Sequence, residues 1–273
     1  MNNFALRAIS GTAYAALIVV ATLAGQPFFG IMLTLFAAFG AAEFCHITTQ
    51  GGTAFKAVTI TATALTVLTA GYSAAFVLLP AIAVVFFLVR GVMALYDKRT
   101  DAFAAMGRAA LCYLYIGLPL AAVNAFSSLI DNTPGSRWVV LMVFVFIWIN
   151  DTGAFLVGSR FGRRRLFERL SPKKSWEGFY GALAFCIAAG VAAAVFVKSP
   201  VGTWQWIVLS VLACVMATWG DLFESLMKRT LGVKDSGNII PGHGGILDRI
   251  DSLLFVAPAA SLFLFLSVYY YIL

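Results

Sequence analysis

Carboxylates, hydroxyls and basic side chains recur at helical spacing near the end of this 273-residue chain. One set falls at positions i, i+3, i+4 and i+7 of a helical face: Asp221, Glu224, Ser225 and Lys228. Asp248 and Asp251 repeat the i, i+3 spacing further on. Hard oxygen ligands of this kind suit Mg²⁺, which usually binds through one or two carboxylates plus substrate phosphates. Lys228 and Arg249 would neutralise phosphate oxygens beside it. The pattern indicates phosphoryl or nucleotidyl transfer, although salt bridges that only cap two helices would share this spacing.

A glycine-rich segment, residues 241–245, lies between these two sets and reads PGHGG. Segments with so little side-chain bulk let backbone N–H groups approach an anion closely. Glycines of this kind also occur in plain turns, so the segment alone is weak evidence for a binding site.

A second polar segment, residues 171–178, reads SPKKSWEG. Pro172 suits a helix start, where N–H groups and the helix dipole favour anions. Lys173 and Lys174 supply charge that pairs with phosphate, and Ser175 adds a hydroxyl. The surrounding stretch, residues 158–178, holds seven basic and two acidic residues and thus a net charge of +5. Topology and anionic lipid account for part of this charge, but we expect phosphate to bind at the SPKKSWEG segment.

A third polar segment interrupts an otherwise apolar stretch. Asn150, Asp151 and Thr152 follow a run of hydrophobic residues. An ionisable residue within a membrane span is costly, so a functional role is the default hypothesis. The alternative is an ion pair with a basic residue of a neighbouring helix. Asn150 and Thr152 beside Asp151 enlarge a polar surface, as a buried substrate cavity would require.

The elements that must position these residues are apolar. The chain is 61% hydrophobic and only 11% charged, which excludes an ordinary soluble enzyme. A membrane-spanning helix needs about 20 mostly apolar residues. Nine segments meet or approach this requirement: residues 9–24, 27–42, 57–70, 74–89, 109–126, 138–157, 179–197, 204–220 and 252–272. The sequence therefore predicts an all-α integral membrane protein, a polytopic bundle of about nine transmembrane helices.

The charged linkers predict how this bundle is oriented. With nine spans, the linkers that carry most of the charge all fall on one side: 43–56, 90–108, 158–178 and 221–251. The positive-inside rule makes that side cytoplasmic, so the N-terminus is cytoplasmic and the C-terminus outside. The same rule explains the net charge of +7, which therefore does not indicate nucleic acid as a partner.

The polar residues also divide the chain by function. We expect a transmembrane scaffold in residues 1–136 and a transmembrane catalytic region in residues 137–273. Glu43 and His46, at a span end of the scaffold, are expected to be interfacial. The four cysteines have neither metal-like spacing nor the pattern of a disulfide framework, and three of them sit deep inside apolar runs, where we expect them to pack as small hydrophobes.

The polar segments together resemble the phosphatidate cytidylyltransferases, also called CDP-diacylglycerol synthases. Residues 225–251 read SLMKRTLGVKDSGNIIPGHGGILDRID and look like the signature of that family without a departure. Residues 171–178 and 150–152 resemble two further recurrent family segments. The resemblance begins near Trp148, and the earlier half is similar only in being short hydrophobic spans.

The resemblance implies a dimeric enzyme of the bacterial inner membrane that makes CDP-diacylglycerol and pyrophosphate from CTP and phosphatidate. It also implies a divalent cation, normally Mg²⁺, held by Asp221 and Asp248, with Asp251 as a weaker candidate. The triphosphate and lipid phosphate would be held by four basic residues: Lys173, Lys174, Lys228 and Arg249. The glycine segment, including Gly244 and Gly245, would cover phosphate or nucleotide, and His243 would either hydrogen-bond a phosphate or order that segment. The lipid tails would enter from the bilayer, with the chemistry at the cytoplasmic boundary.

Two other functions fit parts of this pattern. A CTP-dependent kinase of a membrane lipid alcohol, such as a polyprenol, would share the nucleotide and metal features but release CDP. A transporter with ion-coupling acids would show paired repeats with broken helices in both halves. The polar residues here fall almost wholly in the second half, which disfavours a transporter.

Overall fold

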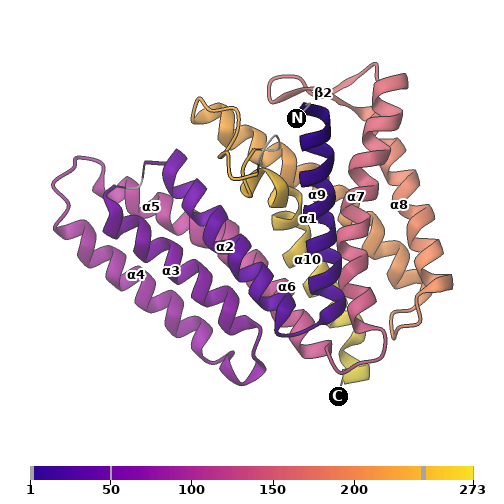
Figure 1. The fold of residues 1–273 in the computed structure, drawn as a ribbon, viewed down its shortest axis with the longest axis horizontal. Helices are drawn as coiled ribbons and strands as arrows, with labels where there is room; N and C mark the ends of the chain where they lie inside the picture. The colour runs from indigo at the N-terminus through magenta and orange to yellow at the C-terminus, as the bar shows by residue number, and fades with distance from the viewer. Residues whose placement is uncertain (1–2, 50, 241–243, 273) are drawn as a thin grey trace. The chain divides into compact units, whose positions relative to one another are not determined.

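Each apolar segment of the chain forms a helix, because a backbone in hydrocarbon must satisfy its hydrogen bonds internally. The computed structural model describes residues 3–49, 51–240 and 244–272 (Figure 1). The helices of the first half are α1 Asn3–Ala24, α2 Phe28–Ile47, α3 Thr53–Ala70, α4 Leu78–Leu95, α5 Ala102–Cys112 and α6 Leu118–Ile130. A short 3₁₀ turn at Ser73–Ala75 precedes α4, and a π-helical turn at Tyr113–Gly117 joins α5 to α6. The second half contains α7 Ser136–Phe161, β1 Arg165–Phe167, β2 Ser171–Ser175, α8 Trp176–Phe196, α9 Thr203–Thr230 and α10 Leu247–Ile272.

This helix order confirms the prediction of an all-α polytopic membrane protein. Within the described residues, eight helical stretches are long and apolar enough to cross a membrane. Ala8–Ala24 is a shorter apolar helix, so each of the nine predicted segments has its own helical counterpart. The predicted ends were less accurate: α9 continues ten residues beyond the apolar run, to Thr230, and α10 begins at Leu247 rather than at 252. A helix can continue past its apolar part into polar residues.

The chain forms two compact units. The first comprises Met1–Leu129 and Val233–Ile250, and the second comprises Ile130–Gly232 and Asp251–Leu273. The predicted division of function between residues 1–136 and 137–273 stays a prediction.

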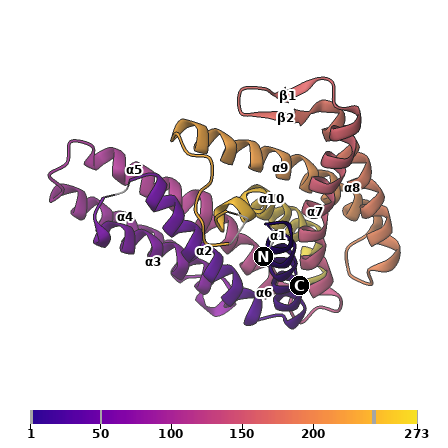
Figure 2. The same ribbon diagram turned by 45° about the horizontal axis from the view of Figure 1, so that its top comes forward.

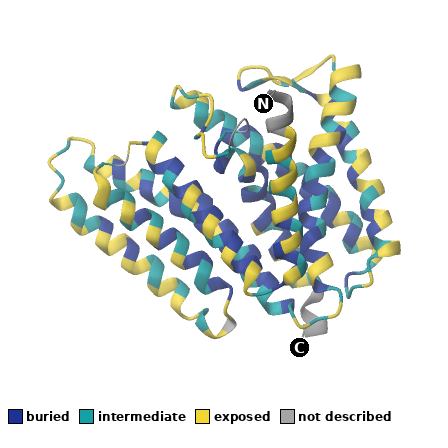
Figure 3. Cartoon of the chain, in the orientation of Figure 1, coloured by how far each residue is buried: buried dark blue, intermediate teal, exposed yellow. Residues whose placement is uncertain are grey.

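The first unit contains three neighbouring helices, α2, α3 and α4, which lie side by side (Figures 1 and 2). Their core includes a buried cluster of Ala62, Phe86, Ala109 and Tyr113. The Tyr113 ring stacks on Phe86 with centroids 5.0 Å apart, and its hydroxyl is 2.8 Å from the Thr66 hydroxyl. Helix α4 buries little more than Phe86 and Arg90, and its outer face is exposed (Figure 3). An apolar face of this kind is suited to contact with lipid.

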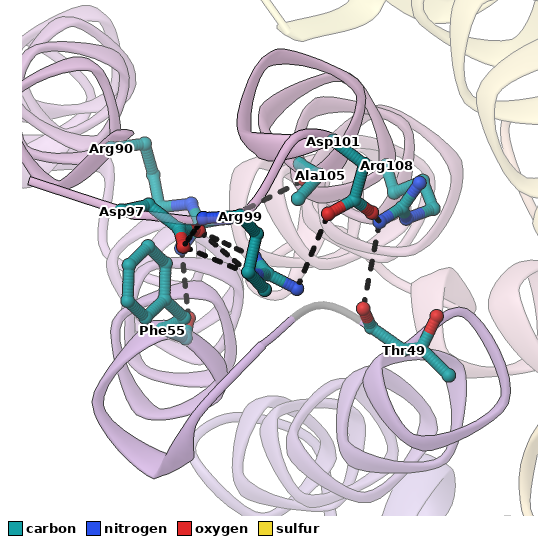
Figure 4. A network of polar contacts seen from close by, with 8 residues as sticks. All are labelled: Thr49, Phe55, Arg90, Asp97, Arg99, Asp101, Ala105 and Arg108. Atoms are coloured by element: carbon teal, nitrogen blue, oxygen red, sulfur yellow. Dashed lines mark hydrogen bonds and ion pairs between the residues drawn. The ribbon is translucent and has the colours of Figure 1, made fainter. Parts of the chain in front are cut away.

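A polar network joins α3, α4 and α5 at one end of this unit (Figure 4). Arg90 is 1% exposed, and its guanidinium donates to the carbonyls of Phe55 and Ala105, both at 3.4 Å. Arg99 forms an ion pair with Asp97, with 2.6 Å between nitrogen and oxygen. The guanidinium of Arg90 also lies 5.0 Å from the centroid of the Phe55 ring, a cation–π contact.

The second unit is built around α7, α8 and α9. Its buried core includes Ala182, Cys186 and Cys214, and Trp206 packs edge-on against Phe146 with centroids 6.2 Å apart. All four cysteines of the chain are buried thiols, which confirms that they pack as small hydrophobes.

Candidate active site

The basic SPKKSWEG segment forms the second strand of a hairpin and the start of a helix (Figure 2). Strands β1 and β2 pair antiparallel, with Arg165 opposite Ser175. The predicted helix start at Pro172 was wrong: Pro172 lies in β2, and α8 begins at Trp176. Ser175 is the residue that caps the helix, because its hydroxyl oxygen accepts the N–H of Gly178 at 3.2 Å.

Glu177, in the first turn of α8, fixes the entry to the hairpin. One carboxylate oxygen accepts the backbone N–H groups of Arg163 at 3.0 Å and Arg164 at 3.2 Å. The carboxylate also suits the positive end of the helix dipole. The segment thus places Lys173 and Lys174 on a strand that is held at both ends.

Helices α7 and α8 approach closely through glycines. A Cβ atom on Gly178 would lie 3.0 Å from the Ala154 carbonyl oxygen and 3.2 Å from the Gly158 Cα. A Cβ on Gly153 would lie 3.0 Å from the Ala182 Cα. Small residues at such crossings are typical of membrane helix pairs. This contact brings Asn150 and Asp151 of α7 near the start of α8.

Helix α9 carries the predicted polar face. Asp221 and Ser225 are joined by a 3.4 Å hydrogen bond from the serine hydroxyl, and Lys228 forms a 2.6 Å ion pair with Glu224. The helical spacing of these four residues is therefore confirmed. Lys174 of β2 reaches this face, with its Nζ 2.6 Å from an Asp221 carboxylate oxygen.

Lys174 and Asp221 belong to the lining of a cavity of about 540 Å³ within the second unit. Six of its lining residues were predicted to bind substrate or act in catalysis: Asn150, Asp151, Lys173, Lys174, Ser175 and Asp221. Arg165 adds a third basic side chain to the lining. A cavity of this size with clustered cations fits a phosphorylated ligand.

Thr218 and Arg165 are two of the lining residues that the sequence analysis did not predict. Thr218 donates its hydroxyl to the Asn150 side-chain oxygen at 3.4 Å, and it precedes Asp221 by three residues on the same helix. Its helical spacing was a signal that could have found it. Arg165 lies in a run of three arginines, and nothing in the residue types distinguishes it from the other two; its pairing opposite Ser175 in the hairpin does.

Asp251 joins the acidic part of the same unit. Its helix packs against α9, because a Cβ on Gly220 would lie 2.8 Å from the Asp251 carbonyl oxygen and the Ser252 hydroxyl donates to the Ala217 carbonyl at 3.2 Å. The Asp251 carboxylate interacts electrostatically with Asp221. Asp221 of α9 and Asp251 of α10 thus lie on two helices that pack together in the second unit, and a joint role of their carboxylates stays a prediction.

Whether the site suits a divalent cation can be judged from the side chains that could bind one. Within the described ranges, no group of three or more His, Cys, Asp or Glu side chains is arranged to hold a metal ion. Asp221 and Asp251 lie on two helices that pack against each other, and Asp221 forms an ion pair with Lys174. Two carboxylates with substrate phosphates are a donor set that fits Mg²⁺.

The remaining predicted residues belong to the first unit. Asp248, in the first turn of α10, accepts the N–H of Gly245 at 2.8 Å and the N–H of Ser236 at 3.1 Å. The Arg249 side chain is exposed, and its backbone carbonyl accepts the Tyr14 hydroxyl at 3.0 Å. Gly244 has a positive φ of 85°, a conformation that favours glycine.

The predictions for His243 and Glu43 concern single residues outside the cavity. His243 lies outside the described residues. The expectation that Glu43 and His46 are interfacial stays a prediction, and in the structure Glu43 is buried in the protein with 6% exposed, whereas His46 is exposed. The Glu43 carboxylate accepts hydrogen bonds from a segment near the start of α10.

The sequence of the chain is similar to that of known proteins. The sequence profile of a family described as the cytidylyltransferase family matches residues 5–267. A protein of Staphylococcus saprophyticus named phosphatidate cytidylyltransferase is 36% identical over 159 residues, which cover 57% of this chain and 59% of that protein. A protein of the same name from Staphylococcus aureus is 41% identical over 128 residues, which cover 47% of this chain and 49% of that protein. The matches thus span about half to three-fifths of the length of these curated relatives.

Proposed function

The chain belongs to the cytidylyltransferase family, and we propose that it transfers the cytidylyl group of CTP to phosphatidate, giving CDP-diacylglycerol and pyrophosphate. The name shared by its relatives supports this choice of substrates. The observation that carries the proposal is the cavity that joins Lys173 and Lys174 to Asp221 inside a membrane-spanning unit. A lipid phosphate and a nucleotide triphosphate both need such cations.

In the proposed reaction, no side chain has to form a covalent bond with a substrate. A phosphate oxygen of phosphatidate attacks the α-phosphorus of CTP in line, the new P–O bond forms, and the bond to the β-phosphate breaks as pyrophosphate leaves. The nucleophile is already anionic, so no strong general base is needed. The work of the protein is to position the two anions and offset their repulsion.

The basic residues supply most of this compensation. Lys173 and Lys174 would bind the triphosphate or the lipid phosphate in the cavity, and Arg165 adds charge beside them. Without substrate, the Lys174 ammonium is paired with Asp221. When substrate binds, the ammonium would turn from Asp221 to a phosphate. Ser175, Asn150 and Asp151 would complete the polar wall around the nucleotide.

Mg²⁺ is the proposed cofactor. Asp221 and Asp251 would hold it, and it would supply positive charge to phosphate oxygens. Asp248 lies in the other compact unit, and its share in binding the cation stays a prediction. Roles for Lys228, Ser225, Arg249, Gly244, Gly245 and His243 in holding substrate are likewise proposals from the signature.

The remaining proposals concern the location of the protein and its oligomeric state. We propose the bacterial inner membrane as the location, with the chemistry at the cytoplasmic boundary and a homodimer as the assembly. The multi-pass helices and the bacterial relatives support a bacterial membrane.

The test is an assay with purified protein in detergent. Phosphatidate, Mg²⁺ and CTP labelled at the α-phosphorus should yield labelled CDP-diacylglycerol and unlabelled pyrophosphate. A lipid alcohol offered in place of phosphatidate should yield no CDP. Release of CDP with a phosphorylated alcohol would make the protein a kinase, and absence of lipid product with both acceptors would overturn enzymatic transfer altogether.

A further inference from the structure

Glu43 has a buried carboxylate that the reaction proposed above does not use. It lies in α2, a membrane-spanning helix, where an ionised group is costly unless its acceptor positions are filled. One oxygen accepts the N–H of Ile246 at 3.0 Å, and the other accepts the N–H of Leu247 at 2.9 Å. The Ser236 hydroxyl donates to it at 3.1 Å. Three donors thus converge on one buried carboxylate.

The glycines of this segment make room for that carboxylate. A Cβ atom on Gly237 or on Gly245 would meet a Glu43 oxygen at about 2.4 Å, closer than real Cβ contacts. Gly245 therefore has a packing reason to be glycine, besides the approach of a ligand that the sequence suggested. The segment is shaped around Glu43.

The same segment holds Asp248. Ser236 donates its N–H to Asp248 and its hydroxyl to Glu43, so one serine is held by both carboxylates. Ile246 and Leu247 provide N–H groups of the kind that a helix start leaves without an intrahelical partner, and a negative charge is favourable there. Glu43 thus sets where α10 begins and therefore where Asp248 and Arg249 stand.

We propose that Glu43 is a positioning residue for cytidylyl transfer, because its carboxylate ties the start of α10 and Ser236 to α2. This inference rests on the proposed function. Glu43 itself touches no reacting group and acts through the residues of the signature that it holds. Loss of one of its oxygens as an acceptor should loosen this segment and slow turnover. The lining of the cavity in the other unit should stay unchanged.

The experiment uses the full chain in detergent and two readouts. Hydrogen exchange of the peptide covering residues 244–250 is measured in Glu43→Gln, Glu43→Asp and Ser236→Ala. Asp97→Asn is the matched control, since Asp97 is an acidic residue of the same unit that accepts hydrogen bonds from Arg99 instead. Turnover is measured as kcat and KM for CTP per mole of folded protein.

The expected result has a definite size. In Glu43→Gln, exchange in residues 244–250 should rise about 10- to 100-fold, because hydrogen bonds to a charged acceptor are lost. In the same variant kcat should fall about tenfold or more while KM for CTP stays within about threefold. Ser236→Ala should show the same changes to a smaller extent, Glu43→Asp should recover part of the kcat, and Asp97→Asn should match the unchanged protein.

Several results would overturn the proposal for Glu43. Unchanged exchange and kcat in folded Glu43→Gln would overturn the proposal, as would a loss of thermal stability with kcat per folded molecule unchanged. If Glu43→Gln does not fold, Ser236→Ala and Glu43→Asp decide by the same criteria. If the unchanged protein makes no CDP-diacylglycerol, the proposed function fails, and the exchange data alone still show whether Glu43 holds the segment.

Discussion

At the scale of the residue, Lys174 is the cation that joins the hairpin to the acidic face of α9. Its Nζ is 2.6 Å from Asp221, and both residues line the cavity. Lys174→Met keeps most of the aliphatic stem and removes the charge that a phosphate would need. We expect kcat/KM for CTP to fall by about 100-fold or more, since one preorganised cation at a transferring phosphate is worth several kcal/mol.

A matched control for Lys174 exists in the same hairpin. Arg169 is an exposed cation in the turn between β1 and β2, and it is not among the described residues that line the cavity. Arg169→Met removes the same charge and should change kcat/KM by less than about threefold, as expected for a screened surface charge. Equal losses in the two variants would mean that general charge, and not the site at Lys174, drives the effect.

The residue scale also shows what sequence can and cannot predict. Asp221, Ser225 and Lys228 were placed correctly because helical spacing alone puts them on one face. The hydrogen-bond partners of Glu43 were not predicted, because they lie 193 to 204 positions away. Two of those partners are backbone N–H groups, which any residue other than proline can supply, so residue types left no signal.

At the scale of the element, the approach of α7 to α8 depends on Gly178. A Cβ there would meet the Ala154 carbonyl oxygen at 3.0 Å and the Ser175 hydroxyl at 3.2 Å. Gly178→Ala should push α8 away from α7 and destabilise the fold by about 1–3 kcal/mol, the usual cost of overpacking. Thermal unfolding in detergent measures this loss, and activity should fall with it because the cavity lies at that crossing.

Gly91 of α4 is the control for that prediction. Apart from its chain neighbours and the nearby backbone of its own helix, no atom lies within 4 Å of a Cβ built on it. Gly91→Ala should therefore leave stability unchanged or raise it by up to about 1 kcal/mol, because alanine loses less backbone entropy in a helix. A melting temperature lowered equally by both substitutions would contradict the packing argument.

The link between α4 and α5 should respond to acid. The hydrogen bond from Arg99 lowers the pKa of the Asp97 carboxyl, and the hydrogen bond from Arg108 lowers the pKa of Asp101. A carboxyl with a lowered folded-state pKa stabilises the fold above its ordinary pKa of about 3.9, and that stability is lost as pH falls through the lowered value. Thermal unfolding from pH 6 to pH 3 should therefore show a steeper acid loss in the unchanged protein than in Asp97→Asn. Parallel curves for the two proteins would contradict it.

The elements themselves differ in how far sequence predicted them. The membrane helices were found because length and apolarity are their defining properties, as α4 and α8 illustrate. The β1–β2 hairpin was not found, because its strands are only three and five residues long, polar, and irregular in register between Arg165 and Phe167. The early start of α10 was missed because hydrogen bonds of Glu43 and Asp248, and not apolarity, determine it.

At the scale of the whole molecule, membrane orientation is the open prediction with the clearest physical basis. The linkers expected in the cytoplasm carry most of the basic residues, including the run from Arg160 to Lys174. The linkers expected outside are short and hold few charges, as in residues 198–203. Positive residues beside short loops are retained on the cytoplasmic side. If the eight candidate spans of the described residues and the shorter apolar helix Ala8–Ala24 all cross the membrane, the C-terminus should lie outside when the N-terminus is cytoplasmic.

Reporter fusions in bacteria test this orientation and the ninth span together. A fluorescent protein fused after Gly232, before α10, should fluoresce, because that linker is expected in the cytoplasm. Alkaline phosphatase fused after Leu273 should be active, because α10 would have carried it across the membrane, and the fluorescent protein should stay dark at that place. The two fusions differ only by the segment that contains Asp248, Asp251 and α10, so opposite signals assign the crossing to α10 itself. Fluorescence at both places would show that α10 does not cross, which would break the alternation on which the cytoplasmic side of all four charged linkers depends.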